Sequence, residues 1–584
     1  MVQTHGGDRV AEVLQKRGVE RIFTLCGGHI SPLLTGAKSK GLSVVDVRDE
    51  VSAVFAADAT ARMTGVPGVA AVTAGPGVTN TVTAVKNAQM AQSPILIFGG
   101  ATATVLKGRG SLQDIDQLSL MEPLTKWATS LTRVKELAPA VEYALDTAMS
   151  GTPGPVFIEV PVDLLYPEDV VRDWFMKESG VEEADTLTKK ALKVYLQGHL
   201  MNQFKAPANP LRYRSSRPSH GVGDDEAEII DGLAELLEEA ERPALVMGSQ
   251  TLVNYTPDEA QSLTEAVQAL GIPTFLAGGS RGLLGRDSDL QFRHRRSRAL
   301  RASDMAIIAG FPFDFRLKYG QCFGSDTDVV AINLDRDALT TNQNPEVALQ
   351  MHPGHFLRQL ANREPTPRDR HDWFASLQER EEARDANIEE MGEDETPNIN
   401  AIKLFQHIEH VMDDDSVLVV DGGDFVATGA YILKPRRPLS WLDPGVFGTL
   451  GVGGGFAVGA ALARPDAEVW LIWGDGSSAY SLAEFDTCLR HGLAPIAVIG
   501  MDGAWAQIER DQSVILDDDV ATTLLPTAYH TVAEGYGAKG LLLVDPADID
   551  DVLKEAKRLA AEGTPVVINA HISQTDFRQG SLSM

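Results

Sequence analysis

Two acidic turns near the carboxyl end of the chain have the residue types of a metal–phosphate site. The apolar run 468–473 leads into Gly474-Asp475-Gly476-Ser477, and the apolar run 495–499 leads into Met501-Asp502. In an open parallel sheet, carboxylates that follow strands face the crevice where ligands bind. Two such carboxylates can hold a hard divalent cation beside a phosphate, which the glycines let the main chain approach. A lone Gly-Asp-Gly is equally typical of an ordinary strand-to-helix turn.

Other candidate residues follow further apolar runs. Glu50 ends the strand-like stretch that begins at Val45, and the alanine-rich helical stretch 51–63 follows it, near whose start an acid also suits the helix dipole. Asp421-Gly422-Gly423-Asp424-Phe425 follows the run 417–420 in the same way. The glycine-dense stretch 443–455 predicts a turn that packs against a ligand, or a flexible loop. Each feature alone allows both a structural and a functional interpretation.

The elements that must position these residues predict an α/β protein. Strands are expected at 21–25, 69–73, 95–99, 156–160, 244–247, 305–309, 329–334, 417–420, 468–473, 495–499 and 566–570. Helices are expected at 8–17, 51–63, 456–462 and 482–491. Strands that alternate with helices indicate parallel sheets covered on both faces. We therefore predict three doubly wound parallel-sheet domains.

The length of 584 residues exceeds what one hydrophobic core supports. The predicted domains cover 1–180, 223–362 and 397–570. The polar stretch 181–222, which contains Pro210 and Pro218, and the charged stretch 363–396 are predicted linkers, the second partly helical. Residues 571–584 are predicted to form a tail that is either a frayed end or a lid.

Composition limits the partners and the compartment. A net charge of −29 argues against nucleic acid and against an anionic membrane surface. The three cysteines show no metal-ligand spacing, and no apolar run approaches the ~20 residues that span a bilayer. Because the amino terminus also lacks the pattern of a signal peptide, a cytoplasmic protein is expected.

Longer strings resemble a known family. Twenty-four residues lie between Gly476 and Met501, the spacing of the thiamine-diphosphate fingerprint, in which Asn-Asn is usual where Met501-Asp502 stands here. The whole chain resembles the acetolactate synthase superfamily, and within it the acetolactate synthase-like proteins that act as 2-hydroxyacyl-CoA lyases. The strings that carry the likeness are 27–34, 83–94, 441–452 and 575–578.

The resemblance implies thiamine diphosphate and Mg²⁺ as cofactors. Glu50 would hydrogen-bond the aminopyrimidine, Leu450 would support the bent cofactor, and Asp475, Asp502 and the Ala504 carbonyl would bind the metal. The other cofactor-binding residues it implies are Asn80, Gly423, Asp424, Phe425, Gly448, Gly474, Gly476 and Ser477. In this family the two ends of each cofactor contact different subunits, which implies a homodimer or homotetramer.

The implied reaction cleaves a 2-hydroxyacyl-CoA to formyl-CoA and an aldehyde or ketone, or runs in reverse as an acyloin condensation. His29, in the glycine turn after the first strand, is the expected proton carrier, although a polar residue near a helix start would look the same. Gln113 is expected to orient the substrate oxygen. Two alternatives stay open, an acetolactate synthase or other 2-ketoacid carboligase or decarboxylase, and an inactive regulatory homologue.

Departures from the synthase pattern favour the lyase. The synthase Phe-Gln-Glu is Leu112-Gln113-Asp114 here, and Phe-Asp-Asp-Arg is Phe313-Asp314-Phe315-Arg316. The synthase Trp-Glu pair beyond the metal site is also missing. The central domain is expected to hold ADP, FAD or nothing. The basic run 293–298 would either meet phosphates of CoA or a nucleotide, or form a solvated helix face.

Overall fold

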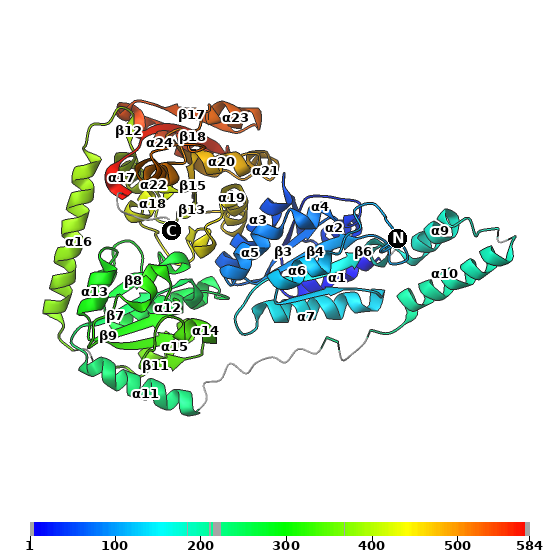
Figure 1. Ribbon diagram of the computed structural model, residues 1–584, viewed down its shortest axis with the longest axis horizontal. Helices are drawn as coiled ribbons and strands as arrows, with labels where there is room; N and C mark the ends of the chain where they lie inside the picture. The colour runs from blue at the N-terminus through cyan, green and yellow to red at the C-terminus, as the bar shows by residue number, and fades with distance from the viewer. Residues whose placement is uncertain (1–4, 184, 209–211, 214–223, 367, 579–584) are drawn as a thin grey trace. The chain divides into compact units, whose positions relative to one another are not determined.

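The computed structural model describes residues 5–183, 185–208, 212–213, 224–366 and 368–578 (Figure 1). The chain divides into two compact units, one of residues 1–61 and 66–218 and the other of residues 62–65 and 219–584. The first unit holds one sheet and the second holds two, and all paired strands in the three sheets run parallel. The predicted architecture of three parallel-sheet α/β domains is confirmed.

The first sheet has the strand order β2-β1-β3-β4-β6-β5. Its strands are β1 (Arg21–Thr24), β2 (Ser43–Asp46), β3 (Gly68–Val72), β4 (Ile95–Ala101), β5 (Trp127–Ser130) and β6 (Val156–Pro161). Its helices are α1 (Gly6–Lys16), α2 (Ser31–Ser39), α3 (Glu50–Thr64), α4 (Pro76–Thr79), α5 (Val82–Met90), α6 (Gln117–Met121), α7 (Leu137–Met149), α8 (Val162–Leu165), α9 (Glu168–Glu178) and α10 (Leu187–Lys205). Every residue of β3, β4 and β6 is buried, as a strand covered on both faces requires.

The central sheet has the order β11-β10-β9-β7-β8. Its strands are β7 (Pro243–Met247), β8 (Thr274–Leu276), β9 (Met305–Ala309), β10 (Asp328–Ile332) and β11 (Val347–Leu349). Its helices are α11 (Asp224–Glu239), α12 (Pro257–Leu270), α13 (Arg296–Ala302), α14 (Arg336–Thr340) and α15 (Pro353–Ala361). Ile307 packs into one hydrophobic core and its neighbour Ile308 into another, so the sheet carries a core on each face.

The third sheet has the order β12-β18-β16-β15-β13-β14, with β17 also paired to β18. Its strands are β12 (Ile399–Asn400), β13 (Val417–Asp421), β14 (Trp441–Leu442), β15 (Val469–Gly474), β16 (Ile496–Met501), β17 (Lys539–Leu543) and β18 (Val566–Ser573). Its helices are α17 (Ala401–Val411), α18 (Asp424–Ile432), α19 (Val452–Ala463), α20 (Asp475–Ser481), α21 (Glu484–Arg490), α22 (Ala506–Leu516), α23 (Tyr529–Gly535) and α24 (Ile549–Ala561). The neighbouring strands β13, β15 and β16 therefore end side by side, just before the acidic turns.

The predicted linkers contain more structure than the sequence suggested. Helix α10 has 19 residues and lies within 181–222, although Pro210 and Pro218 fall outside the described residues. Helix α16 (His371–Gly392) occupies most of 363–396. Its Trp373 packs in a central core and its Ile388 in the third domain's core, so α16 ties these two domains together.

Three differences from the predicted element boundaries bear on the candidate residues and the tail. Strand β2 ends at Asp46, so Glu50 is the first residue of α3 rather than the end of a strand. Helix α19 begins at Val452, four residues before the expected start, because the Asp421 carboxylate accepts hydrogen bonds from amides of its first turn. Strand β18 continues to Ser573 by pairing with β12, and the buried Phe577 follows it, so the described part of the tail is not frayed. None of the described helices is long and apolar enough to cross a membrane.

Candidate functional site

Glu50 and Asn80 meet at the carboxyl edge of the first sheet. Glu50 opens α3 just beyond β2 and is 7% exposed, whereas Asn80 follows α4 and is exposed. Asn80 Nδ2 donates a hydrogen bond to Glu50 Oε2 at 3.1 Å. The structure thus joins two residues that lie thirty positions apart in the sequence. The bond orients a buried carboxylate while leaving its other oxygen able to contact a ligand.

His29 lies at the same edge, in the turn after β1. Its Nδ1 is 3.2 Å from the Thr73 hydroxyl, which follows the adjacent strand β3. Burial lowers the pKa of His29, so the imidazole is neutral near pH 7 and can accept a proton. The second ring nitrogen has no hydrogen-bond partner within the described residues.

Two glutamines, Gln113 and Gln117, lie close to this edge. The sequence predicted a role for Gln113, which makes fewer contacts than Gln117. Gln113 has a left-handed backbone (φ 62°), and its carbonyl oxygen lies against Gly75, at 2.8 Å from where a Cβ would stand. The buried Gln117 accepts a hydrogen bond from the Gly75 amide at 2.8 Å and donates to Glu159 at 2.8 Å. Gln117 therefore fixes the Gly75 turn. No signal in the sequence singled it out.

Asp475 and Asp502 form an acidic pair at the carboxyl edge of the third sheet. Asp475 starts α20 after β15, and its two oxygens accept the amides of Gly476 at 2.7 Å and of Gly503 at 2.9 Å. Asp502 follows β16 and accepts the Ala504 amide at 3.2 Å. Burial, and then the charge of Asp475, raise the pKa of Asp502 to about 7; burial also raises that of Asp475.

The acidic pair suits a divalent cation. Two carboxylates that repel each other, the buried Asp475 and the half-buried Asp502, gain most from a cation placed between them, and their oxygens are ligands that Mg²⁺ accepts. Ala504, the third predicted ligand, is buried beside them and bridges Thr523, which holds the turn in place. The donor set thus fits the metal that the sequence implied.

Asp421, which was not among the predicted site residues, organises the same edge. Its buried carboxylate accepts the amide of Gly453 at 2.8 Å, that of Gly451 at 3.1 Å and the Trp473 indole N–H at 3.0 Å. Burial raises its pKa to about 6. Asp421 thereby holds the Leu450 turn against the strand that carries Asp475. Its position at the end of an apolar run was visible in the sequence, but its partners were not.

The remaining predicted residues divide by what their side chains contact. Asp424 accepts a hydrogen bond from Arg510 Nη1 at 2.6 Å. Phe425 packs in the core against Phe405, with ring centroids 4.5 Å apart, so it could meet a diphosphate only through its main chain. Ser477 donates to the Asp421 carbonyl at 2.8 Å and fixes the start of α20.

Glycines shape the rest of the edge. Gly423 and Gly474 precede α18 and α20, and Gly448 adopts a left-handed backbone at φ 63° before Leu450. Gly476 is required by its neighbour Trp505, since a Cβ there would lie 2.5 Å from the indole ring. The Trp505 ring therefore lies directly on the Gly-Asp-Gly turn.

Comparisons with known proteins agree with this geometry. Residues 4–120, 230–360 and 421–570 match the N-terminal TPP binding domain, the central domain and the C-terminal TPP binding domain of thiamine pyrophosphate enzymes, thiamine pyrophosphate being another name for thiamine diphosphate. The chain belongs to this family of thiamine-pyrophosphate enzymes.

Several relatives cover nearly the whole chain. A 2-hydroxyacyl-CoA lyase 2 of Danio rerio is 47% identical over 99% of this chain and 93% of its own length. The human 2-hydroxyacyl-CoA lyase 2 is 45% identical over 99% and 92%. A probable acetolactate synthase of Mycobacterium bovis is 32% identical over 97% and 95%.

Proposed function

We propose that this protein is a thiamine-diphosphate-dependent carbon–carbon lyase that cleaves 2-hydroxyacyl-CoA to formyl-CoA and an aldehyde or ketone. The observation that carries the proposal is the identity of 47% to a lyase of that name along 99% of the chain. The residues that cofactor chemistry needs, Glu50, Asp475 and Asp502, are all present in suitable surroundings, which speaks against an inactive homologue.

The cofactor, when bound, supplies a nucleophilic carbon and an electron sink. We infer that Glu50, oriented by Asn80, hydrogen-bonds the aminopyrimidine ring. Mg²⁺ would be held by Asp475, Asp502 and the Ala504 carbonyl, with Leu450 supporting the cofactor from its turn. Gly423, Gly474, Gly476 and Ser477 would present main chain to the diphosphate.

His29 is the proposed proton carrier. It is neutral near pH 7, half-buried and held by Thr73, so its ring can accept the proton of the substrate 2-hydroxyl as the carbon–carbon bond breaks. Gln113, whose side chain makes no hydrogen bond within the described residues, would orient the substrate oxygen.

Incubation with thiamine diphosphate, Mg²⁺ and a panel of 2-hydroxyacyl-CoAs tests the proposal, with mass detection of formyl-CoA and the carbonyl product. Glu50→Gln should abolish turnover, and His29→Ala should lower kcat with little change in folding. A Glu50→Gln variant that keeps full activity would refute the role of Glu50.

An acetolactate synthase is the second candidate, supported by the relative that is 32% identical. The chain favours it less because Leu112, at the position of the synthase aromatic residue, is 82% exposed. Acetolactate formed from pyruvate in place of formyl-CoA would select this alternative. The binding of ADP or FAD in the central domain stays a prediction, which analysis of bound nucleotide can check. The homodimer or homotetramer also stays a prediction, which light scattering can check.

A further inference from the structure

A strongly cationic cavity lies in the second unit, away from the acidic pair. Its volume is about 790 Å³, and nine of its 21 lining residues are arginine or lysine. None of those lining residues is acidic, although the chain carries a net charge of −29. The lining comes from the central domain, from α16, from the end of α18 and from the segment after β18. Such a local excess of positive charge needs an anionic partner.

Some of these arginines build the wall of the cavity. Arg281 Nη1 donates to the Ala430 carbonyl at 2.7 Å, and Arg293 Nη2 donates to the Leu433 carbonyl at 2.8 Å. Both bonds tie the central domain to the carboxyl end of α18. Burial lowers the pKa of Arg293 to about 10, so it still carries its charge at neutral pH. These residues hold the site together.

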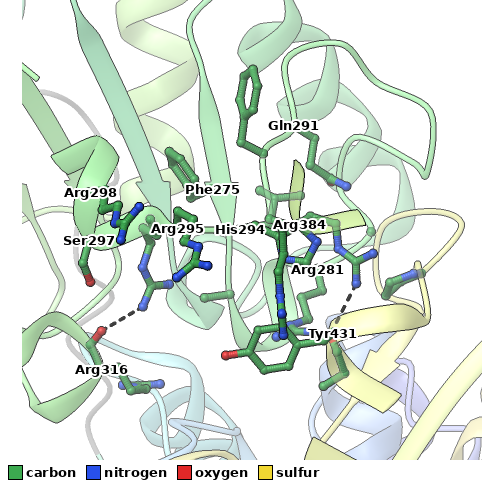
Figure 2. Close-up of a pocket in the computed structure, with 18 of the residues that line it drawn as sticks. Phe275, Arg281, Gln291, His294, Arg295, Ser297, Arg298, Arg316, Arg384 and Tyr431 are labelled. Carbon is green, nitrogen blue, oxygen red and sulfur yellow. Dashed lines mark hydrogen bonds between the residues drawn. The ribbon is translucent and has the colours of Figure 1, made fainter. Parts of the chain in front are cut away.

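Other cations face the cavity without a counter-charge. Arg295 and Arg298 are exposed, and neither they nor Lys318 have a side-chain hydrogen bond or ion pair within the described residues. Figure 2 shows the side chains of Arg281 and Arg384 beside the Tyr431 ring, with Arg295 to their left. Burial, and then repulsion from Arg295, lower the pKa of Arg384. An anion placed here would relieve that repulsion.

Acidic side chains beside the cavity make contacts of their own, and one of them, Asp314, pairs with the lining residue Arg316 at 2.6 Å. Glu381 accepts the main-chain amides of Arg293 at 2.9 Å and His294 at 3.0 Å. Asp385 Oδ1 lies 2.9 Å from His294 Nε2, and the His294 ring stacks on Tyr431. These two acids therefore shape the loop and leave the side chains of Arg295, Arg298 and Lys318 without a counter-charge within the described residues.

Aromatic faces line the same cavity. The Arg384 guanidinium lies over the Phe577 ring at 4.9 Å, and Arg578 lies over Tyr431 at 5.3 Å. Phe275 and Phe292 complete this apolar part of the lining. Arginine guanidinium groups bind phosphates through paired hydrogen bonds, and aromatic rings stack on planar bases. Sites that combine the two are therefore typical of ligands in which phosphates are attached to a planar base.

We propose that this cavity binds the phosphate groups of the CoA moiety of the substrate, an assignment that rests on the proposed function. CoA carries a diphosphate and a separate 3′-phosphate beside adenine, and the unpaired cations come from two separate segments, Arg295 and Arg298 from one and Lys318 from the other. ADP and FAD carry only a diphosphate and would leave more of those cations unpaired. Arg298, Lys318 and Arg384 are the side chains assigned to phosphate.

Helix α18 connects the two sites. Its first residue, Asp424, lies at the diphosphate edge, and its last residue, Ile432, offers one of the carbonyls that hold Arg293. Nine helical residues rise about 13 Å. The extended pantetheine arm of CoA covers such a span, so a thioester anchored in the cavity can reach the edge that holds Asp475.

The test compares two arginines on α13. Arg298 lines the cavity, whereas Arg301 is equally exposed on the same helix but lies outside it. Calorimetric titration with CoA should show about a 10- to 100-fold weaker Kd for Arg298→Ala combined with Arg384→Ala, as expected for lost charge-assisted bonds to phosphate. Arg301→Ala should match the wild type. Lysine in place of alanine at position 298 of the double variant should recover part of the CoA affinity, which excludes misfolding as the cause of the loss.

Analogues identify the ligand. The wild type should bind CoA more tightly than 3′-dephospho-CoA, ADP or FAD, and the double variant should lose that preference. Equal CoA affinity in the double variant, or tighter binding of ADP or FAD, would overturn the assignment. Because these titrations need no turnover, failure of the lyase assay does not affect them. Formyl-CoA release with an unchanged KM in the double variant would leave the function standing and refute the cavity's role.

Discussion

Charged side chains of opposite sign gather near the two ends of α18. Each group lowers its internal electrostatic repulsion in a different way. At the first end, Asp475 and Asp502 face each other, and the pKa of Asp502 rises to about 7. At the other end, Arg293 keeps its charge with a pKa of about 10 and donates to main-chain carbonyls. A carboxylate can take up a proton when its ligand is absent, whereas an arginine cannot. The acidic site should therefore respond to pH, and the cationic site to ionic strength.

The largest effect is expected from removing the Asp475 carboxylate from the acidic site. Asp475→Ala deletes one member of a buried, amide-bonded pair and should weaken Mg²⁺-dependent binding of thiamine diphosphate about 100- to 1000-fold. Titration of the apo-protein with the cofactor measures this. Asp466→Ala, an exposed acid outside the edge, serves as the matched control. Equal cofactor affinity in both variants would show that the acidic pair is not the metal site.

The pH response of the same site is the next largest effect. Because the folded pKa of Asp502 lies above its ordinary value of 3.8, its ionisation destabilises the apo-protein as pH rises from about 4 to 7. A cation binds the ionised form, so cofactor affinity should fall by up to about tenfold per pH unit below pH 7. Asp502→Asn should flatten this dependence. Titrations at pH 5.5, 6.5 and 7.5 measure it, and an unchanged slope in the variant would contradict the assignment.

A smaller effect is expected at Asp421, which organises the edge without being predicted to touch the metal. Asp421→Asn turns a donor toward groups that themselves donate, namely two amides and the Trp473 indole. The free energy of unfolding should drop by about 1–3 kcal/mol. Urea unfolding of the apo-protein measures the loss. A variant as stable as the wild type would show that the Leu450 turn does not depend on this carboxylate.

The smallest effect concerns salt. Raising the ionic strength from 0.05 to 0.5 M should weaken CoA binding several-fold, because exposed cations such as Arg295 and Arg298 are readily screened. Calorimetry at the two ionic strengths checks this. CoA affinity that does not change with salt would place the phosphates away from these side chains.

The strands and the acidic turns could be predicted because the signal is local. Strand β9 has the predicted bounds, and Asp475 and Asp502 follow adjacent strands as expected. Apolar runs of parallel strands are continuous, so they stand out in a single sequence.

Tertiary partners could not be predicted. Asp421 acts through Gly451, Gly453 and Trp473, which lie 30 to 52 positions away. The early start of α19 has the same origin, since a carboxylate from another strand supports its first turn. The basic run was noticed in the sequence, but its hydrogen bonds to α18 and the cavity it shares with Arg384 depend on segments more than 80 residues distant.

The pairing of β12 with β18 has a consequence for synthesis. Ile399 opens the third domain and pairs with Ile572, near the end of the described chain. The sheet that carries both acidic turns thus cannot close until β18 has left the ribosome, and Phe577 and Arg578 complete the cationic cavity only after that. The first unit, in contrast, is encoded upstream and can fold while translation continues. While residues between β12 and β18 are being synthesised, the nascent chain therefore exposes an unfinished third domain, the segment on which we expect chaperones to act.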